Sequence, residues 1–168
     1  MGSTISAMTD SSELVAVELT ERERKFIQHA LYQWQFSATS QPFPFQALGL
    51  SSTWDEFDEL TGRLSYAIIG SEALTDLDWA RVLYLVESSW ASDLVGAGLD
   101  FATVTGFSDT EAVALLRGLQ RKIGGRKRAE LLFPNGVRIP TADEIEKQKR
   151  WLEDLRREQA GRQYPPGL

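Results

Sequence analysis

Residues 108–125 read SDTEAVALLRGLQRKIGG, and this stretch decides the fold class. Ser108, followed three residues later by Glu111, forms a capping box, in which the hydroxyl and the carboxylate satisfy free amides at a helix start. Gly124 and Gly125 end the segment. Apolar residues recur between these signals at helical spacing. They predict an amphipathic helix whose inward face is made of Ala112, Leu115, Leu116, Leu119 and Ile123.

The same start signal precedes other stretches with helical spacing. A threonine stands three residues before a glutamate at Thr20, Thr53 and Thr141. A further helix is predicted to begin at residue 75 or 76 and to run towards residue 93, and a short helical turn is predicted over 100–105. The sequence therefore predicts a mainly α protein with about five helices packed around an aromatic-rich core.

One β-hairpin is predicted near residues 129–139. Apolar runs flank Pro-Asn-Gly at 134–136, and this tripeptide is typical of a turn between two strands. Residues 13–19 alternate weakly between apolar and polar side chains, which fits either a short strand or a lead-in to the first helix. The organisation that follows is a mobile tail over 1–18, a single helical domain over 19–139, and a peripheral C-terminal helix and tail over 140–168.

The tryptophans are expected to lie mainly on inward faces of the helices. Trp151 differs, because it neighbours Leu152 on a helix whose other faces are charged, and it is read as an interface residue. The segment 41–46, which alternates proline and phenylalanine, is either a lid over the core or a recognition loop. Four tryptophans are assigned to the core: Trp34, Trp54, Trp79 and Trp90.

The residue inventory gives little support to catalysis. The 168 residues include no cysteine and one histidine, so thiolate chemistry is excluded and a histidine cluster cannot form. His29 is expected to be partly buried and bonded to a backbone group. Asp55 and Glu59 share a helix face, but like-charged pairs on exposed faces are common. We predict a non-enzymatic protein with no metal and no cofactor. With no apolar run of about 18 residues, the expected location is the cytoplasm.

Charge is distributed unevenly along the chain. Residues 1–116 carry 17 acidic and 5 basic side chains, whereas residues 117–168 carry 7 acidic and 13 basic ones. Basic residues at the end of a helix also complement the helix dipole, so a solvated helix end is the alternative to a binding surface. The candidate anion-binding residues are Arg117, Arg121, Lys122, Arg126, Lys127 and Arg128.

Residues 100–139 resemble a winged helix. Gly106 lies where the turn of a helix-turn-helix falls, Ala102 precedes it by four residues, and the predicted hairpin takes the place of the wing. This resemblance implies binding of nucleic acid through the basic segment 117–138. Asp109 and Glu111 depart from the pattern, because acids at the start of a recognition helix repel the duplex.

We therefore predict a protein-binding module whose acidic helical surface contacts a basic protein, in the manner of an immunity or antitoxin protein. A winged-helix-like nucleic-acid-binding protein is the alternative, and no membrane partner is expected. The predicted acidic contact residues are Asp55, Glu56, Asp58, Glu59, Asp76 and Asp78.

Overall fold

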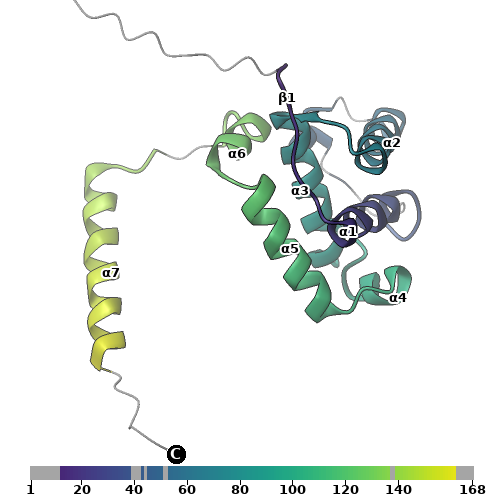
Figure 1. Cartoon of the computed structure of the whole chain (residues 1–168). Helices are drawn as coiled ribbons and strands as arrows, with labels where there is room; N and C mark the ends of the chain where they lie inside the picture. The colour runs from purple at the N-terminus through teal and green to yellow at the C-terminus, as the bar shows by residue number, and fades with distance from the viewer. Residues whose placement is uncertain (1–11, 39–42, 44, 51–52, 137–138, 162–168) are drawn as a thin grey trace, which may run out of the picture. The chain divides into compact units, whose positions relative to one another are not determined.

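The computed structural model describes residues 12–38, 43, 45–50, 53–136 and 139–161. The chain forms two compact units, residues 1–135 and residues 136–168. The mainly α fold is confirmed (Figure 1). The first unit contains α1 (Glu21–Tyr32), α2 (Trp54–Gly70), α3 (Asp76–Ala91), α4 (Phe101–Thr105), α5 (Asp109–Ile123) and α6 (Arg126–Leu132), and the second contains α7 (Ala142–Gly161).

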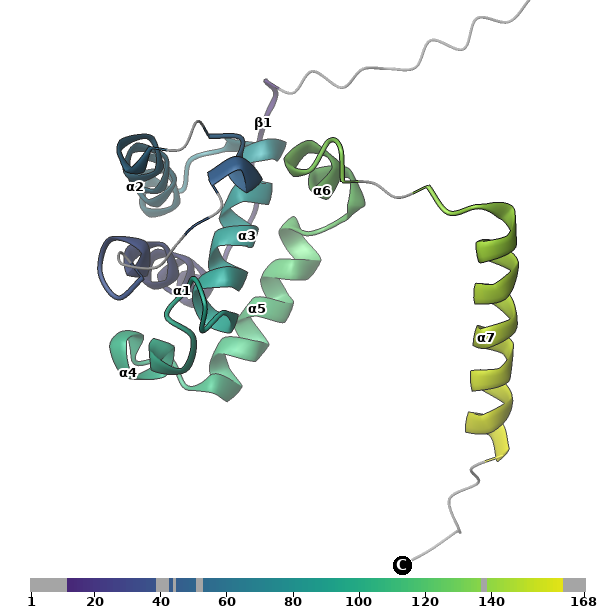
Figure 2. The same ribbon diagram turned by 180° about the vertical axis from the view of Figure 1, so that it is seen from behind.

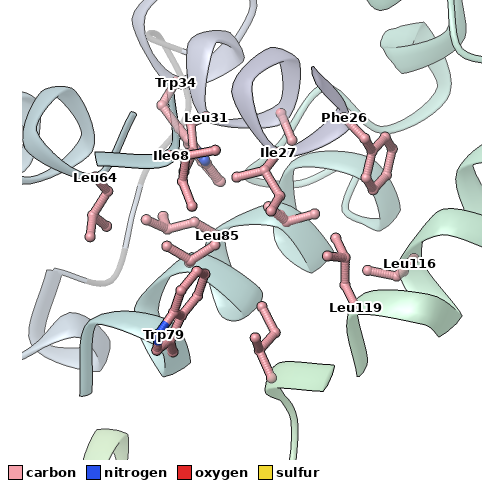
Figure 3. Close-up of a cluster of buried hydrophobic side chains, with 14 of the residues drawn as sticks. Phe26, Ile27, Leu31, Trp34, Leu64, Ile68, Trp79, Leu85, Leu116 and Leu119 are labelled. Carbon is pink, nitrogen blue, oxygen red and sulfur yellow. The ribbon is translucent and has the colours of Figure 1, made fainter. Parts of the chain in front are cut away.

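Helix α3 lies at the centre of the first unit. It packs against α1, α5 and α6, while α2 packs on α1, as both views of the ribbon show (Figure 2). Side chains from these helices meet in one hydrophobic core (Figure 3). Its largest fully buried members include Phe26, Ile27, Leu31, Trp34, Leu64, Ile68, Trp79, Leu85 and Leu119.

The helix starts fall where the capping signals predict them. The Thr20 hydroxyl accepts a hydrogen bond from the Glu23 amide at 3.1 Å, and the Glu23 carboxylate accepts one from the Thr20 amide at 2.7 Å. Thr141 and Glu144 form the same reciprocal pair. At Ser108 the hydroxyl accepts the amide three residues later. Local hydrogen bonding thus sets where these helices begin.

The N-terminal segment belongs to the folded unit from residue 14 onwards. Strand β1 (Leu14–Val15) pairs antiparallel with β2 (Leu74–Thr75), and the Trp79 indole nitrogen donates to the Val15 carbonyl at 2.8 Å. The strand alternative for residues 13–19 is therefore the one observed. The predicted mobile tail over 1–18 ends too late, and residues 1–11 lie outside the described residues.

The predicted hairpin near 129–139 is wrong. Residues 126–132 form α6, in which Arg126 pairs with Glu130 one turn later and Leu132 is buried. Arginine, alanine, glutamate and leucine all favour helix, and Pro134 then marks the stop. Helix α6 occupies the position predicted for the first strand of the wing, so the structure does not contain the hairpin on which the winged-helix resemblance depends. Residues 137–138 lie outside the described residues.

The aromatic residues bear out most of the core assignment. Trp34 and Trp79 are fully buried and Trp90 is half-buried, but Trp54 is 38% exposed and does not belong to the core. Trp54 opens α2 and leans edge-on against Phe45 and Phe57, which cover only part of its ring. In the 41–46 segment, Phe43 and Phe45 pack on Phe57, as a lid would, while residues 41, 42 and 44 are not described.

The inward face of α5 predicts a measurable loss of stability. Leu116 is buried against the core (Figure 3), so Leu116→Ala should lower the free energy of unfolding by about 2 to 5 kcal/mol. Chemical denaturation measures this loss. Ala114, on the exposed side of the same helix, provides the control, because Ala114→Ser should change stability by less than about 0.5 kcal/mol. A similarly small loss for Leu116→Ala would show that the inward face is misassigned.

Candidate functional site

A groove runs between α1 and α2, which lie antiparallel. The Arg24 guanidinium, early in α1, donates to the Ile68 carbonyl late in α2 at 3.4 Å. The ring of Trp34, just after α1, lies 5.8 Å from that of Phe57, early in α2. Beside this contact the two helices leave a cavity of about 470 Å³, lined by Gln28, His29, Leu31, Tyr32 and Gln35 on one side and by Thr61, Gly62, Ser65, Tyr66 and Ile69 on the other.

The rim of this groove is unusually apolar for an exposed surface. The lining residues Tyr32, Tyr66 and Ile69 are 55%, 76% and 57% exposed. Next to them, Phe36 is 57% exposed and its ring stacks on that of Tyr32 with centroids 4.2 Å apart. Gly62 contributes no side chain, and nothing lies within 4 Å of where a Cβ would stand. Contiguous exposed apolar side chains of this kind mark interaction surfaces.

The acidic residues of α2 continue the same row. Gly62, Ser65 and Ile69 line the groove, and Asp58 and Asp55 precede them at helical spacings of four and three residues. Both carboxylates are exposed. Because the helices are antiparallel, these carboxylates stand at the end of the groove where Tyr32 and Phe36 lie.

The other two predicted acids of α2 are exposed as well. Glu59 lies two turns before Tyr66 and so on the same side of the helix, whereas Glu56 points more than a third of a turn away from the row. We define Asp55, Asp58 and Glu59 as the acidic end of the groove. Acids in the first turns of α2 also complement the positive end of its dipole, so they stabilise the helix that carries them.

Asp78 does not belong to the exposed acidic surface, contrary to the prediction. Its side chain is buried. The carboxylate accepts hydrogen bonds from both terminal nitrogens of Arg63, at 2.8 and 3.0 Å, and from one terminal nitrogen of Arg81 at 3.0 Å. Burial disfavours the charged carboxylate, but these arginine contacts outweigh it, so the pKa of Asp78 lies below its usual value. Asp78 holds α2 and α3 together.

Asp76 is also engaged within the protein. Its carboxylate pairs with Arg128 at 2.8 Å and lies 3.9 Å from the Lys127 ammonium. A predicted acidic contact residue and two predicted anion-binding residues therefore neutralise one another, at the point where α6 meets α3.

Two of the four remaining basic candidates, Lys122 and Arg126, are paired with carboxylates. Lys122 binds buried Glu23 at 2.6 Å, and Arg126 binds Glu130 at 2.6 Å. Burial raises the pKa of Glu23, but its bonds to Lys122 and Thr20 prevail, so that pKa is lowered. Arg117 donates to Gln120 at 2.7 Å.

His29 differs from its expected role. It is exposed on the groove wall, and its ring meets Phe107 edge-on with centroids 5.6 Å apart. Sequence reasoning missed the groove residues Tyr32, Tyr66 and Ile69. A signal was present, because Tyr66 and Ile69 are large apolar residues off the inward stripe of their helix.

No family model, curated protein or solved structure matches this chain. Among the described residues, no helix has both the length and the apolar character to cross a bilayer. The same part of the chain holds no cluster of three histidine or carboxylate side chains arranged to bind a metal ion.

Proposed function

We propose that the protein is a non-enzymatic binding module that holds a basic amphipathic helix of a partner protein in the α1/α2 groove. The observation that carries this proposal is the exposed aromatic rim of the groove continuing into the acidic end at Asp55, Asp58 and Glu59. An apolar face would supply contact area, and lysines or arginines beyond that face would meet the carboxylates.

The form of the groove supports a helical ligand. Its walls are two helices, and its lining residues recur along each at three- and four-residue spacing. Amphipathic helices bind such grooves through apolar residues at the same spacing. Tyrosines suit this role because each presents a broad apolar ring with a polar tip and few rotatable bonds.

Charge supports a basic partner. The chain has a formal net charge of −6, and the acidic end faces solvent. An acidic surface of this kind raises the rate of association with a basic protein more than it raises the affinity. The immunity or antitoxin role predicted from the sequence would be one instance of such binding, with a basic toxin as the partner.

A probe peptide tests the proposal directly. We would titrate the full chain with a helical peptide of about 18 residues, five turns, bearing leucine along one stripe and lysine elsewhere. Micromolar binding is expected. The pair Tyr66→Ser and Ile69→Ser should weaken it more than about tenfold, since two exposed anchors are lost.

Matched controls distinguish binding in the groove from nonspecific binding to exposed apolar residues. Leu94→Ser with Leu99→Ser removes two apolar residues that lie elsewhere and are more exposed than the groove pair, and should leave affinity unchanged. Equal weakening by this pair and by the groove pair would contradict the proposal.

The acidic end has its own test. Asp55→Asn, Asp58→Asn and Glu59→Gln together should slow association with the peptide at low salt several-fold, because steering depends on exposed charge. A variant with Glu13→Gln, Glu18→Gln and Glu153→Gln has the same net charge and should associate as the wild type does. If both triple variants slow association equally, net charge rather than the acidic end is responsible.

Nucleic-acid binding is not the function proposed. Lys122 and Arg128 are paired with carboxylates of the same chain, so phosphate contacts by these two side chains would compete with those pairs. We expect no binding to duplex or single-stranded DNA or RNA near 50 mM salt by fluorescence anisotropy. Binding at micromolar concentration, with log affinity falling by about 0.9 per phosphate contact against log salt, would favour the basic segment instead.

A further inference from the structure

Helix α7 carries an apolar stripe that nothing else in its own unit covers. Within residues 136–168, the described part contains α7 and no other helix or strand. Ile145 and Leu152 remain 41% exposed, and Trp151 remains 61% exposed. Because helices in proteins owe most of their stability to the packing of an apolar face, a helix like this is expected to have a partner.

The stripe follows a heptad repeat. Ile145 and Leu152 fall at the first core position of successive heptads, and Gln148 and Leu155 fall at the second. This spacing of three and four residues forms the seam of a two-stranded coiled coil. Gln148 is a polar residue in that seam, and one such layer commonly fixes register at some cost in stability.

The charges beside the seam are sorted by side. One flank carries Lys149 and Arg156, and the other carries Glu144, Trp151 and Glu158. In a parallel pair of helices each flank meets the opposite flank of the second copy, which places Glu144 near Lys149 and Trp151 near Arg156. The first contact is an ion pair and the second a cation–π contact. In an antiparallel pair each flank would meet itself, and like charges would face each other.

Ion pairs within α7 lie away from the seam. Arg150 pairs with Glu146 and Arg157 with Asp154, all on the outer side of the heptad. Among the described residues, Lys149, Arg156 and Glu158 make no salt bridge. The outer charges thus stabilise the single helix, while Lys149, Arg156 and Glu158 can pair with a neighbour. The Glu144 carboxylate also accepts from Thr141 at the start of the helix.

We propose that α7 pairs with α7 of a second copy as a short parallel coiled coil, so that the protein is a dimer presenting two α1/α2 grooves. This inference does not depend on what the grooves bind. Two and a half heptads bury a small interface, and micromolar self-association is expected.

Sedimentation equilibrium of the full chain tests the dimer. Between about 1 and 500 µM the mass should rise from 18.8 kDa towards twice that value. Leu152→Ser with Leu155→Ser should weaken self-association more than tenfold. Lys147→Ser with Glu153→Ser, on the outer side, should not. A monomer throughout the range, or equal loss in both variants, would overturn the proposal.

Charge exchange provides a second test that leaves the apolar seam intact. A Lys149→Glu variant and a Glu144→Lys variant should each self-associate more weakly than the wild type, because residues 144 and 149 of the two copies then carry like charges. Their mixture should form heterodimers. Failure of the mixture to associate would contradict flank pairing.

Disulfide cross-linking tests whether the two helices are parallel. The chain has no cysteine, so an introduced cysteine is the only thiol. Gln148→Cys should form an intermolecular disulfide at least tenfold faster than Lys147→Cys, since residue 148 meets its own copy only in a parallel dimer. Equal rates would exclude the parallel arrangement.

Discussion

Replacing Phe26 with alanine is expected to lower the free energy of unfolding by about 3 to 5 kcal/mol. Phe26 is fully buried, and its ring lies edge-on to Phe101 at 5.7 Å and to Phe107 at 5.3 Å. The substitution removes the ring that joins α1 to α4 and to the start of α5. Denaturant unfolding followed by circular dichroism measures the loss.

Phe36 provides the matched control for this substitution. It is also a phenylalanine, but it is exposed, so Phe36→Ala should cost no more than about 0.5 kcal/mol. Equal losses for the two variants would mean that α4 and α5 do not pack on α1 as described.

Asp78→Ala is expected to cost about 3 kcal/mol, because it leaves the arginines that Asp78 joins without their partner. Arg81 is nearly covered, and its guanidinium also donates to the Leu48 carbonyl at 3.0 and 3.1 Å. Without the Asp78 carboxylate, the Arg81 guanidinium loses its counter-charge and remains largely buried beside residues 45–48. Asp58→Ala, an exposed change in α2, should cost less than about 0.5 kcal/mol. A small loss for Asp78→Ala would remove this bridge from the account of stability.

Stability should also depend on pH through Asp78. Because its pKa in the folded protein lies below its unfolded value of about 3.9, the stabilisation is complete above that value and is lost as the pH falls through the folded pKa. The wild type should therefore lose stability on acidification more steeply than Asp78→Asn does. Glu23, whose pKa is also lowered, should keep some acid dependence in the variant. Parallel pH profiles of the two proteins would contradict this coupling.

The fold could be predicted wherever the determining interactions are local. Thr20, Ser108 and Thr141 cap the helices that they were expected to begin, because a cap and its partner lie three residues apart. The hairpin prediction failed for a related reason. Pro134-Asn135-Gly136 allows a turn but does not require strands on both sides, and the helix-forming residues before it prevailed.

The site was only partly predictable. The exposed acids of α2 could be read from helical spacing, but the partners of Asp76 and Lys122 stand 52 and 99 residues away in the sequence. Only the tertiary structure shows that these charges are already neutralised. The groove likewise depends on α1 and α2 lying side by side, which the spacing within either helix does not show.

The most direct test of the α1/α2 groove is to map where the basic helical peptide binds. Amide chemical shifts of the isotopically labelled full chain, recorded during the titration, report each residue separately. We expect shifts in Gln28, Tyr32, Gly62, Tyr66 and the acidic end of the groove, and we expect them to disappear in the Tyr66→Ser and Ile69→Ser variant. Shifts centred on α3, α5 or α7 that persist in this variant would contradict binding in the α1/α2 groove.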